Sequence, residues 1–382
     1  MKPKKIGVVT GTRAEFGILE PLISALHKSG DFELMLYPCG MHMSEFYGNT
    51  LKDIKYAPES TVDMELKDFN SQYDMANSVS IGVEKFSEIF SKNPPDLLIV
   101  LGDRIEQFSA ATAATIMSVP LAHLHGGEVS SGIDNILRNA ITKMAQLHFA
   151  ATNLSKQRIL ALGEEEWRVH NVGALGIDSL LSLKKLSKGE LAKKYGLDDH
   201  KDWIIVLFHS DTKHLGNEDQ IMQNLLDALI ELPAEKIIIY PNADVGSKGI
   251  IQSINSVEGR EGFSTHKSLP HLDFVSFMFN SVFMIGNSSS GLIEAPTLKL
   301  PVINVGTRQS GRESASNVVN VSGLDKEELE CAIKTVLHDD AFQEKLSRLV
   351  SPYGTGRTCP EILSILGRVE VNEDFLHKTP PC

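Results

Sequence analysis

The stretch LLIVLGDRIEQFSAATAATIMSVPLAHLHGGEVSSGIDNILRNAITKM, residues 97–144, decides the fold that this sequence predicts. Its two apolar runs, 97–101 and 119–124, each have the length of a buried strand, and a helical stretch rich in small residues separates them. Each run ends in glycine beside charged or titratable residues. In an open parallel sheet, ligands bind outside the carboxyl ends of the strands. This stretch therefore predicts a βαβ unit with a functional site at its strand ends.

The ionisable residues near these two strand ends suggest chemistry rather than packing. They are Asp103, Arg104, His123, His125, Glu128 and Asp134. If two of the carboxylates lie close together in a poorly solvated cleft, one pKa rises and that group can act as an acid. Asp134 also has a simpler explanation as a helix N-cap, and His123 taken alone as a hydrogen-bonded core histidine.

The pair His123 and His125 could bind a metal, because residues two apart share one face of a strand. No zinc motif matches, however, and histidine beside carboxylates is also typical of acid–base sites. We therefore favour proton transfer over metal binding, and we expect no metal.

Composition limits the class of protein. The chain has 382 residues, enough for two domains, and its 42% hydrophobic content is typical of a globular fold. The net charge of −12 argues against a nucleic-acid surface, and the four scattered cysteines argue against a disulfide framework or a zinc ribbon. No apolar stretch is long enough to span a membrane. The N-terminal apolar run is too short for a signal peptide, so we expect the first strand of a cytoplasmic protein.

Strand-like and helical patterns alternate along most of the chain, which predicts an α/β protein with two Rossmann-like domains facing across a cleft. The expected N-terminal domain, with the catalytic carboxylates, spans residues 1–175, and a lysine-rich connector follows at 176–202. The expected nucleotide-binding domain spans 203–357. A final helix and a tail, loose after Val369, occupy 358–382.

Three turns are candidates for binding phosphate. Gly11-Thr12-Arg13 follows the first strand, but it lacks the GxGxxG spacing and is equally consistent with an ordinary strand–helix turn. GNSSSG at 286–291 is more specific, because its hydroxyl groups and backbone amides can donate to a diphosphate; Glu294, one turn later, could accept from ribose hydroxyls. Its simpler interpretation is a serine-capped helix. The loop 304–312 adds two arginines. His209 ends the first strand of the second half and could bind or protonate a leaving phosphate.

Taken together, these motifs resemble those of the hydrolysing UDP-N-acetylglucosamine 2-epimerases of sialic-acid and related nonulosonate biosynthesis. The resemblance rests on GTRAE at 11–15, GDRIE at 102–106, HLHGGE at 123–128, GIDNILRNAITKM at 132–144, GNSSSGLIEA at 286–295 and PVINVGTRQSGRESASNV at 301–318. It implies a glycosyltransferase-B-like fold. It also implies release of UDP and N-acetylmannosamine from UDP-N-acetylglucosamine and water, by anti elimination to a 2-acetamidoglucal followed by addition of water.

The resemblance also implies roles for particular residues. Asp103 and Asp134 would be catalytic carboxylates. The residues that would hold the nucleotide diphosphate are Arg13, Arg104, His209, Asn242, Ser288, Ser289, Glu294 and Arg308. We expect no cofactor, a small-molecule nucleotide-sugar substrate, no nucleic-acid or membrane partner, and a homo-oligomer (dimer or tetramer).

The chain departs from relatives at three positions. The branch that contains the animal bifunctional enzyme has glutamate in place of His125 and lysine in place of Gly17, and many relatives have His-Pro where this chain has His209-Ser210. His125 or Glu128 could therefore supply an acid–base group, and which of His125, Glu128 and Asp134 removes the proton stays open. So does the sugar, since some relatives act on 4-acetamido-4,6-dideoxy sugars or on GDP-linked sugars.

Four rival functions follow from the same residues. A non-hydrolysing epimerase would return UDP-N-acetylmannosamine, and a glycosyltransferase of this fold would need an acceptor. A nucleotide-sugar sensor would bind without turnover, and a metal hydrolase would lose activity with chelators.

Overall fold

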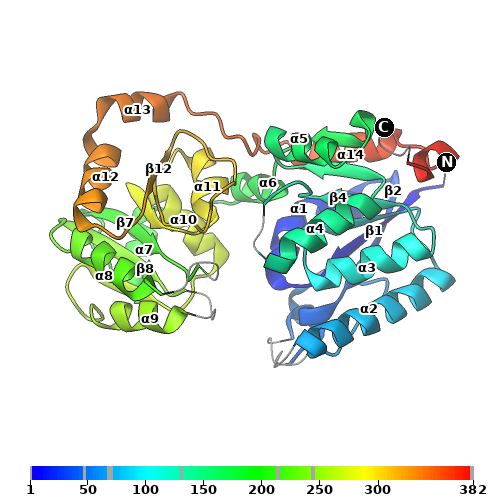
Figure 1. Ribbon diagram of the computed structural model, residues 1–382, viewed down its shortest axis with the longest axis horizontal. Coiled ribbons are helices and arrows are strands. Elements are labelled where there is room, and N and C mark those ends of the chain that lie inside the picture. The colour runs from blue at the N-terminus through cyan, green and yellow to red at the C-terminus, as the bar shows by residue number, and fades with distance from the viewer. Residues whose placement is uncertain are drawn as a thin grey trace. The chain divides into compact units, whose positions relative to one another are not determined.

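The computed structural model describes residues 2–45, 49–66, 72–129, 132–211, 216–241 and 246–378. The chain forms two compact units (Figure 1). The first comprises Met1–Leu181 together with Tyr353–Cys382, and the second comprises Ser182–Pro352. The last helix thus returns to the first unit, an association that no local sequence pattern indicates.

The first unit is a parallel sheet with helices on both faces. Its six strands run in the order β2-β1-β3-β4-β5-β6. They are β1 (Lys4–Thr10), β2 (Phe32–Pro38), β3 (Leu97–Leu101), β4 (Leu121–Leu124), β5 (Leu147–Ala150) and β6 (Val169–Asn171). The helices are α1 (Arg13–Lys28), α2 (Gln72–Lys92), α3 (Ile105–Ile116), α4 (Gly132–Met144), α5 (Asn153–Ala161), α6 (Leu175–Ser182), α14 (Thr358–Arg368) and α15 (Glu373–Leu376), with short 3-10 turns η1 (Gly40–Met43), η2 (Thr50–Asp53) and η3 (Glu166–Arg168).

The second unit repeats this architecture. Its six parallel strands run in the order β12-β11-β10-β7-β8-β9. They are β7 (Asp202–Leu207), β8 (Ala234–Ile239), β9 (Phe263–His266), β10 (Phe283–Gly286), β11 (Val302–Val305) and β12 (Val318–Val321). The helices are α7 (Lys188–Tyr195), α8 (Glu218–Leu229), α9 (Ser247–Asn255), α10 (His271–Asn280), α11 (Ser290–Ile293), α12 (Lys326–His338) and α13 (Asp340–Ser347), with a 3-10 turn η4 (Ala295–Leu298).

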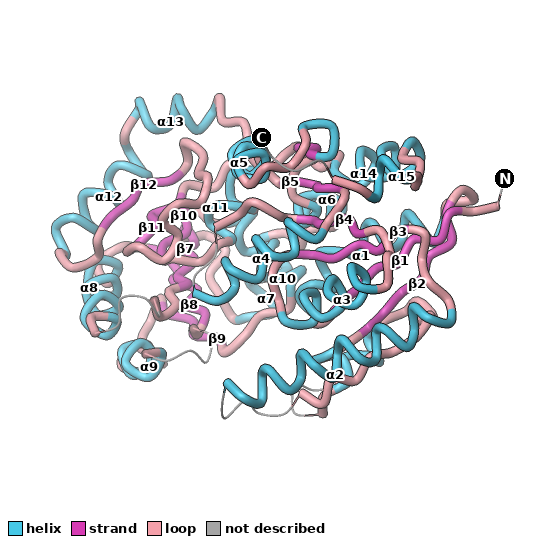
Figure 2. The backbone as a smooth tube through the Cα atoms, turned by 45° about the vertical axis from the view of Figure 1, so that its right-hand side comes forward, coloured by secondary structure: helices cyan, strands magenta, loops and turns pink. Residues whose placement is uncertain are grey.

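Burial on both faces explains the continuous apolar runs of the strands. All of β3, LLIVL, is buried, with one face of its sheet packed under α1 and α14 and the other under α2, α3 and α4 (Figures 1 and 2). In α3, four alanines are fully buried, so this helix packs close to the strands. In the second unit, α8, α9, α12 and α13 cover one face of the sheet, whereas α7 and α10 cover the other.

Two sequence expectations need correction. Strands β9 and β12 at the sheet edges were not predicted, because they are only four residues long and partly polar. The expected loose tail is ordered as far as residue 378, because the buried Arg168 donates hydrogen bonds to the carbonyls of Asp374, Phe375 and His377. Among the described residues, we find no helix both long and apolar enough to cross a membrane.

Candidate active site

The predicted site of the first unit lies where β3 and β4 end side by side. The two strands pair in parallel up to Leu101 and Leu124, so Asp103 and His125 leave the same edge of the sheet. Helix α4 adds Asp134 in its first turn. The tertiary structure thus gathers residues that are as much as 31 positions apart in sequence (134 − 103 = 31).

A residue without an expected role, Arg138, connects these groups. Its guanidinium is buried, forms an ion pair with Asp103, and donates a hydrogen bond of 2.6 Å from Nη1 to the carbonyl of His125. The sequence did contain a signal for it, since Asp134 and Arg138 are spaced i, i+4 and therefore share one face of α4.

His125 adopts a strained backbone conformation and is paired through its ring. Its φ of +60° lies in the left-handed region, which a non-glycine residue occupies only when the surroundings hold it there. The Nδ1 of its ring lies 2.6 Å from Oε1 of Glu128, and both side chains are largely buried. Because an ionised carboxylate only accepts hydrogen bonds, Nδ1 donates and the lone pair is left on Nε2. No described residue is a hydrogen-bond partner of this buried Nε2, so the ring presents a candidate base.

Asp134 is the second candidate acid–base group. Partial removal from water and the nearby carboxylate of Asp103 raise its pKa, while Arg104 and Arg138 act in the opposite direction. The two carboxylates also differ in their partners, since Asp103 forms the ion pair with Arg138. Unequal carboxylates of this kind can divide acid and base roles between them.

His123 is a core histidine, as its simpler interpretation predicted. It is fully buried, with Nε2 2.8 Å from the carbonyl oxygen of Gly102 and Nδ1 3.1 Å from the hydroxyl oxygen of Thr142. Burial lowers its pKa to about 3, so the ring is neutral. Within the part of the chain that the structure describes, no group of three or more His, Cys, Asp or Glu side chains is arranged to hold a metal.

The arginines at the ends of β1 and β3 differ in their surroundings. Arg104 donates to Glu106, a fully buried carboxylate packed against Gly11 and Gly40. Arg13 is 79% exposed, with Asp53 at 3.7 Å. Arg104 is therefore held in place at the strand end, whereas Arg13 lies at the surface of the first unit.

In the second unit, Asn287 connects the ends of three strands. Its side-chain oxygen accepts from the backbone N–H of His209 at 2.7 Å, and its side-chain nitrogen donates to the carbonyl of His209 at 2.8 Å. Its own carbonyl accepts from Arg308 at 3.1 Å and from Gln309 at 2.8 Å. Burial and the charge of Arg308 lower the pKa of His209 to about 4, so its imidazole is neutral near pH 7. The sequence placed Asn287 in a motif but gave it no role.

The serine turn differs in one respect from its prediction. Ser288 is buried and Ser289 half-buried, but the following helix α11 has only four residues before η4 begins. A helix dipole of that length adds little, so any phosphate binding there depends on hydroxyl and backbone donors and on Arg308. Glu294 ends α11 and is half-buried. The predicted binder Asn242 lies outside the described residues.

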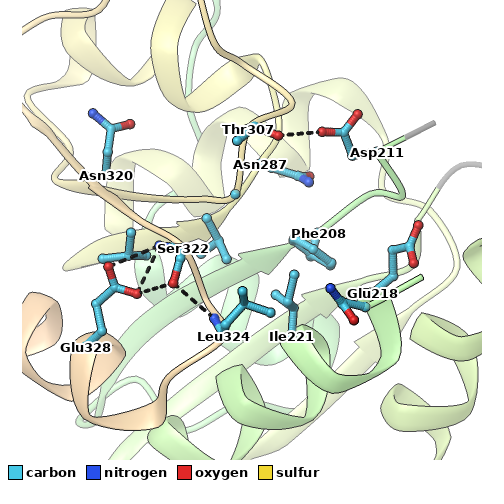
Figure 3. A pocket seen from close by; sticks show the side chains of 14 residues that line it. Phe208, Asp211, Glu218, Ile221, Asn287, Thr307, Asn320, Ser322, Leu324 and Glu328 are labelled. Carbon is cyan, nitrogen blue, oxygen red and sulfur yellow. Dashed lines mark hydrogen bonds between the residues drawn. The ribbon is translucent and has the colours of Figure 1, made fainter. Parts of the chain in front are cut away.

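A cavity of about 460 Å³ lies within the second unit at the ends of β7, β11 and β12 (Figure 3). Its apolar lining residues include Phe208 and Ile221. Its charged lining residues are Asp211, Glu218 and Glu328, all of them acidic. Of the described residues that the sequence predicted for substrate, none lines it. An acidic lining repels a diphosphate, so we do not place the nucleotide in this cavity.

Comparison with known proteins identifies the family. The family model of UDP-N-acetylglucosamine 2-epimerase matches residues 24–367. The chain belongs to this family. The resemblance drawn from the motifs is confirmed, and a member of the UDP-N-acetylglucosamine 2-epimerase family is an enzyme acting on nucleotide sugars.

Two curated relatives match nearly the whole length of this chain. Polysialic acid biosynthesis protein P7 of Escherichia coli is 36% identical over 98% of this chain and 94% of its own. A protein of Legionella pneumophila named UDP-N,N'-diacetylbacillosamine 2-epimerase (hydrolyzing) is 33% identical over 98% of both chains.

Solved structures confirm the glycosyltransferase-B-like fold class of the chain. UDP-GlcNAc 2-epimerase from Neisseria meningitidis, solved with UDP-GlcNAc bound, has a TM-score of 0.80 at 21% identity, covering 95% of this chain and 99% of that one. The Methanocaldococcus jannaschii enzyme, in complex with UDP-GlcNAc and UDP, has a TM-score of 0.72 at 18% identity, covering 95% and 99%.

Proposed function

We propose that this protein is a hydrolysing nucleotide-sugar 2-epimerase, which converts UDP-N-acetylglucosamine and water to N-acetylmannosamine and UDP. The observation that supports it most is the cluster of Asp103, His125, Glu128 and Asp134 at one sheet edge, held by Arg138. Such a cluster suits a reaction that removes a proton from a weakly acidic carbon, because it offers a base, an acid and fixed charges together.

The reaction has two steps. In the first, a base takes the C2 proton while the bond between C1 and the diphosphate oxygen breaks, giving UDP and 2-acetamidoglucal. In the second, water adds to C1 and a proton returns to C2 on the face that inverts this carbon. Two groups qualify as the base. Nε2 of His125 has no hydrogen-bond partner among the described residues, and Asp134 lies at the same sheet edge with a raised pKa.

Most of the residues that we propose to bind the leaving diphosphate belong to the second unit. Arg308 carries the charge, Ser288 and Ser289 supply hydroxyl donors, and Glu294 would accept from the ribose. His209, neutral near pH 7, would donate a hydrogen bond rather than a charge. Arg13, Arg104 and Asn242 complete the proposed set.

Two nucleotide sugars are candidates for the substrate, and they differ in the sugar. UDP-N-acetylglucosamine is our first candidate. UDP-N,N'-diacetylbacillosamine is the second, because two relatives at 33% identity, from Legionella pneumophila and Campylobacter jejuni, carry names that specify this substrate and hydrolysis, the latter with GDP- or UDP-linked sugar.

Proton NMR of the purified protein with each nucleotide sugar in deuterated water tests the proposal. We expect free UDP and N-acetylmannosamine, with deuterium at C2. UDP-N-acetylmannosamine without free UDP would indicate a non-hydrolysing epimerase, and turnover only with an added acceptor sugar would indicate a glycosyltransferase. Loss of activity in chelator would indicate a metal hydrolase. Binding of UDP with no turnover of UDP- or GDP-linked sugars would refute catalysis and indicate a sensor.

A further inference from the structure

Arg138 contacts two different parts of the cluster at once. Its guanidinium pairs with Asp103, which follows β3, and donates to the carbonyl of His125, which follows β4. A guanidinium presents several N–H donors in a fixed plane, so one arginine can fix the direction of a carboxylate and the path of a neighbouring chain together. The side chain is 6% exposed, which strengthens both interactions by excluding water.

The two carboxylates of the cluster are placed unequally relative to this cation. Asp103 is half-buried and in direct contact with Arg138, whereas Asp134 lies one helical turn before Arg138 on the same helix. The charged groups that act on Asp134 are Asp103, Arg104 and Arg138. Of the two carboxylates, Asp103 is therefore oriented by a direct ion pair, whereas Asp134 is affected by the charges around it.

We propose that Arg138 is a positioning residue for the cluster: it orients the carboxylate of Asp103 by an ion pair, acts through its charge on Asp134, one turn earlier on its own helix, and fixes His125 in the backbone conformation that aims its ring. The catalytic part of this proposal rests on the proposed epimerase function. The effect of Arg138 on the pKa of Asp134 does not depend on it. Arg138 reaches the substrate only through the residues it holds.

Two substitutions separate charge from geometry. Arg138→Met removes both, and Arg138→Lys keeps the charge but loses the planar fork. For Arg138→Met we expect kcat to fall on the order of 100-fold. We also expect a change in the profile of kcat against pH. Its limb that reflects the titration of Asp134 should move to a pH higher by about one unit, because one of the two cations that oppose the raised pKa of Asp134 is gone. For Arg138→Lys we expect a reduced kcat, with the Asp134 limb of the kcat–pH profile at its wild-type pH.

The matched control is Arg168→Met, which removes another buried arginine of the same unit, one that binds the C-terminal tail. It should lower the melting temperature without moving the pH limb. An Arg138→Met limb at its wild-type pH would overturn the proposal, because a merely structural arginine predicts that result. If Arg138→Met fails to fold, Arg138→Lys tests the proposal instead. A wild-type kcat in Arg138→Lys would exclude a role for the planar guanidinium.

A second readout needs no turnover. Carbon-13 NMR of aspartate carboxyl carbons follows the titration of Asp134 in the free protein. We expect its pKa to be higher in Arg138→Met than in wild type, and unchanged in Arg168→Met. If no nucleotide sugar is converted, the proposed function fails while this titration still tests the inference. An unshifted Asp134 would refute the inference even in an active enzyme.

Discussion

The guanidinium of Arg104 donates two hydrogen bonds to the carboxylate of Glu106, Nε to Oε2 and Nη2 to Oε1, each 3.2 Å long. Glu106 fits there because two glycines make room: a Cβ at Gly11 would lie 2.8 Å from the Cγ of Glu106, and a Cβ at Gly40 only 2.4 Å. A second buried acid, Glu15, lies beside this pair and accepts from the Gly11 N–H at 2.7 Å. The glycine turn predicted to bind phosphate thus also covers two buried carboxylates.

The first prediction concerns Glu15 and stability. Burial and the charge of Glu106 raise its pKa to about 7. Between pH 4.5 and 7 the folded state therefore binds more protons at this site than the unfolded state, and the contribution of Glu15 to stability falls as pH rises. We compare the unfolding free energy of the wild type with that of Glu15→Gln. The value for the wild type minus the value for the variant should decrease by up to about 3 kcal/mol as the pH rises across this window.

Urea unfolding at several pH values measures this difference. Taking a difference is necessary because buried histidines act in the opposite direction: His123, with its pKa lowered to about 3, loses its contribution as pH falls below 6.5. Glu261→Gln, at a side chain that is 94% exposed, is the control and should show a flat difference. A flat difference for Glu15→Gln as well would contradict the prediction.

The second prediction concerns Asp103. Asp103→Asn should lower kcat by about 10²–10⁴-fold, because it removes both a carboxylate of the cluster and the partner of Arg138. Its affinity for UDP, measured by calorimetry, should stay at the wild-type value, since Asp103 itself is not one of the proposed diphosphate contacts. Unchanged turnover would remove Asp103 from the mechanism.

The third prediction concerns Arg308. Its guanidinium is fixed by the carbonyl of Asn287, which makes it a preorganised partner for a diphosphate. Arg308→Ala should weaken UDP binding by about 1.5–3 kcal/mol, roughly 10- to 150-fold in Kd. Arg348→Ala, at an exposed arginine that directly follows α13, should bind UDP as the wild type does. Equal calorimetric affinities in the two variants would count against a phosphate role for Arg308.

The fourth prediction concerns the C-terminal segment. Ending the chain at Asn372 removes three carbonyls that accept from the buried Arg168. Each buried donor left without a partner costs about 1–3 kcal/mol, so the truncated protein should melt well below the full chain. Arg168 keeps its ion pair with Glu165 and its hydrogen bond to the carbonyl of Gln146, so adding Arg168→Met to the truncation should lower the melting temperature less than the same substitution does in the full chain. Thermal unfolding of the four proteins provides the check, and an equal loss from Arg168→Met in both backgrounds would refute this account.

Much of the fold could be predicted from sequence, because buried parallel strands are continuous apolar runs and the turns after them contain glycine. The runs 97–101 and 119–124 became β3 and β4, and the alternation of strands and helices gave two Rossmann-like units. The edge strand β12 was missed because VVNV is only four residues long and contains a polar residue, and its pairing with β11 depends on a sheet already formed.

The sequence by itself determined which residue types gather near the strand ends, because the carboxyl edge of a parallel sheet follows from the order of strands and turns. Only the tertiary structure decided what those residues do for one another. It brought Arg138 onto Asp103 and the His125 carbonyl, set His125 against Glu128, and buried His123 away from both. The reason is physical: hydrogen bonds, burial and pKa values depend on distances between side chains, and spacing along the chain fixes those distances only within a single helix or strand.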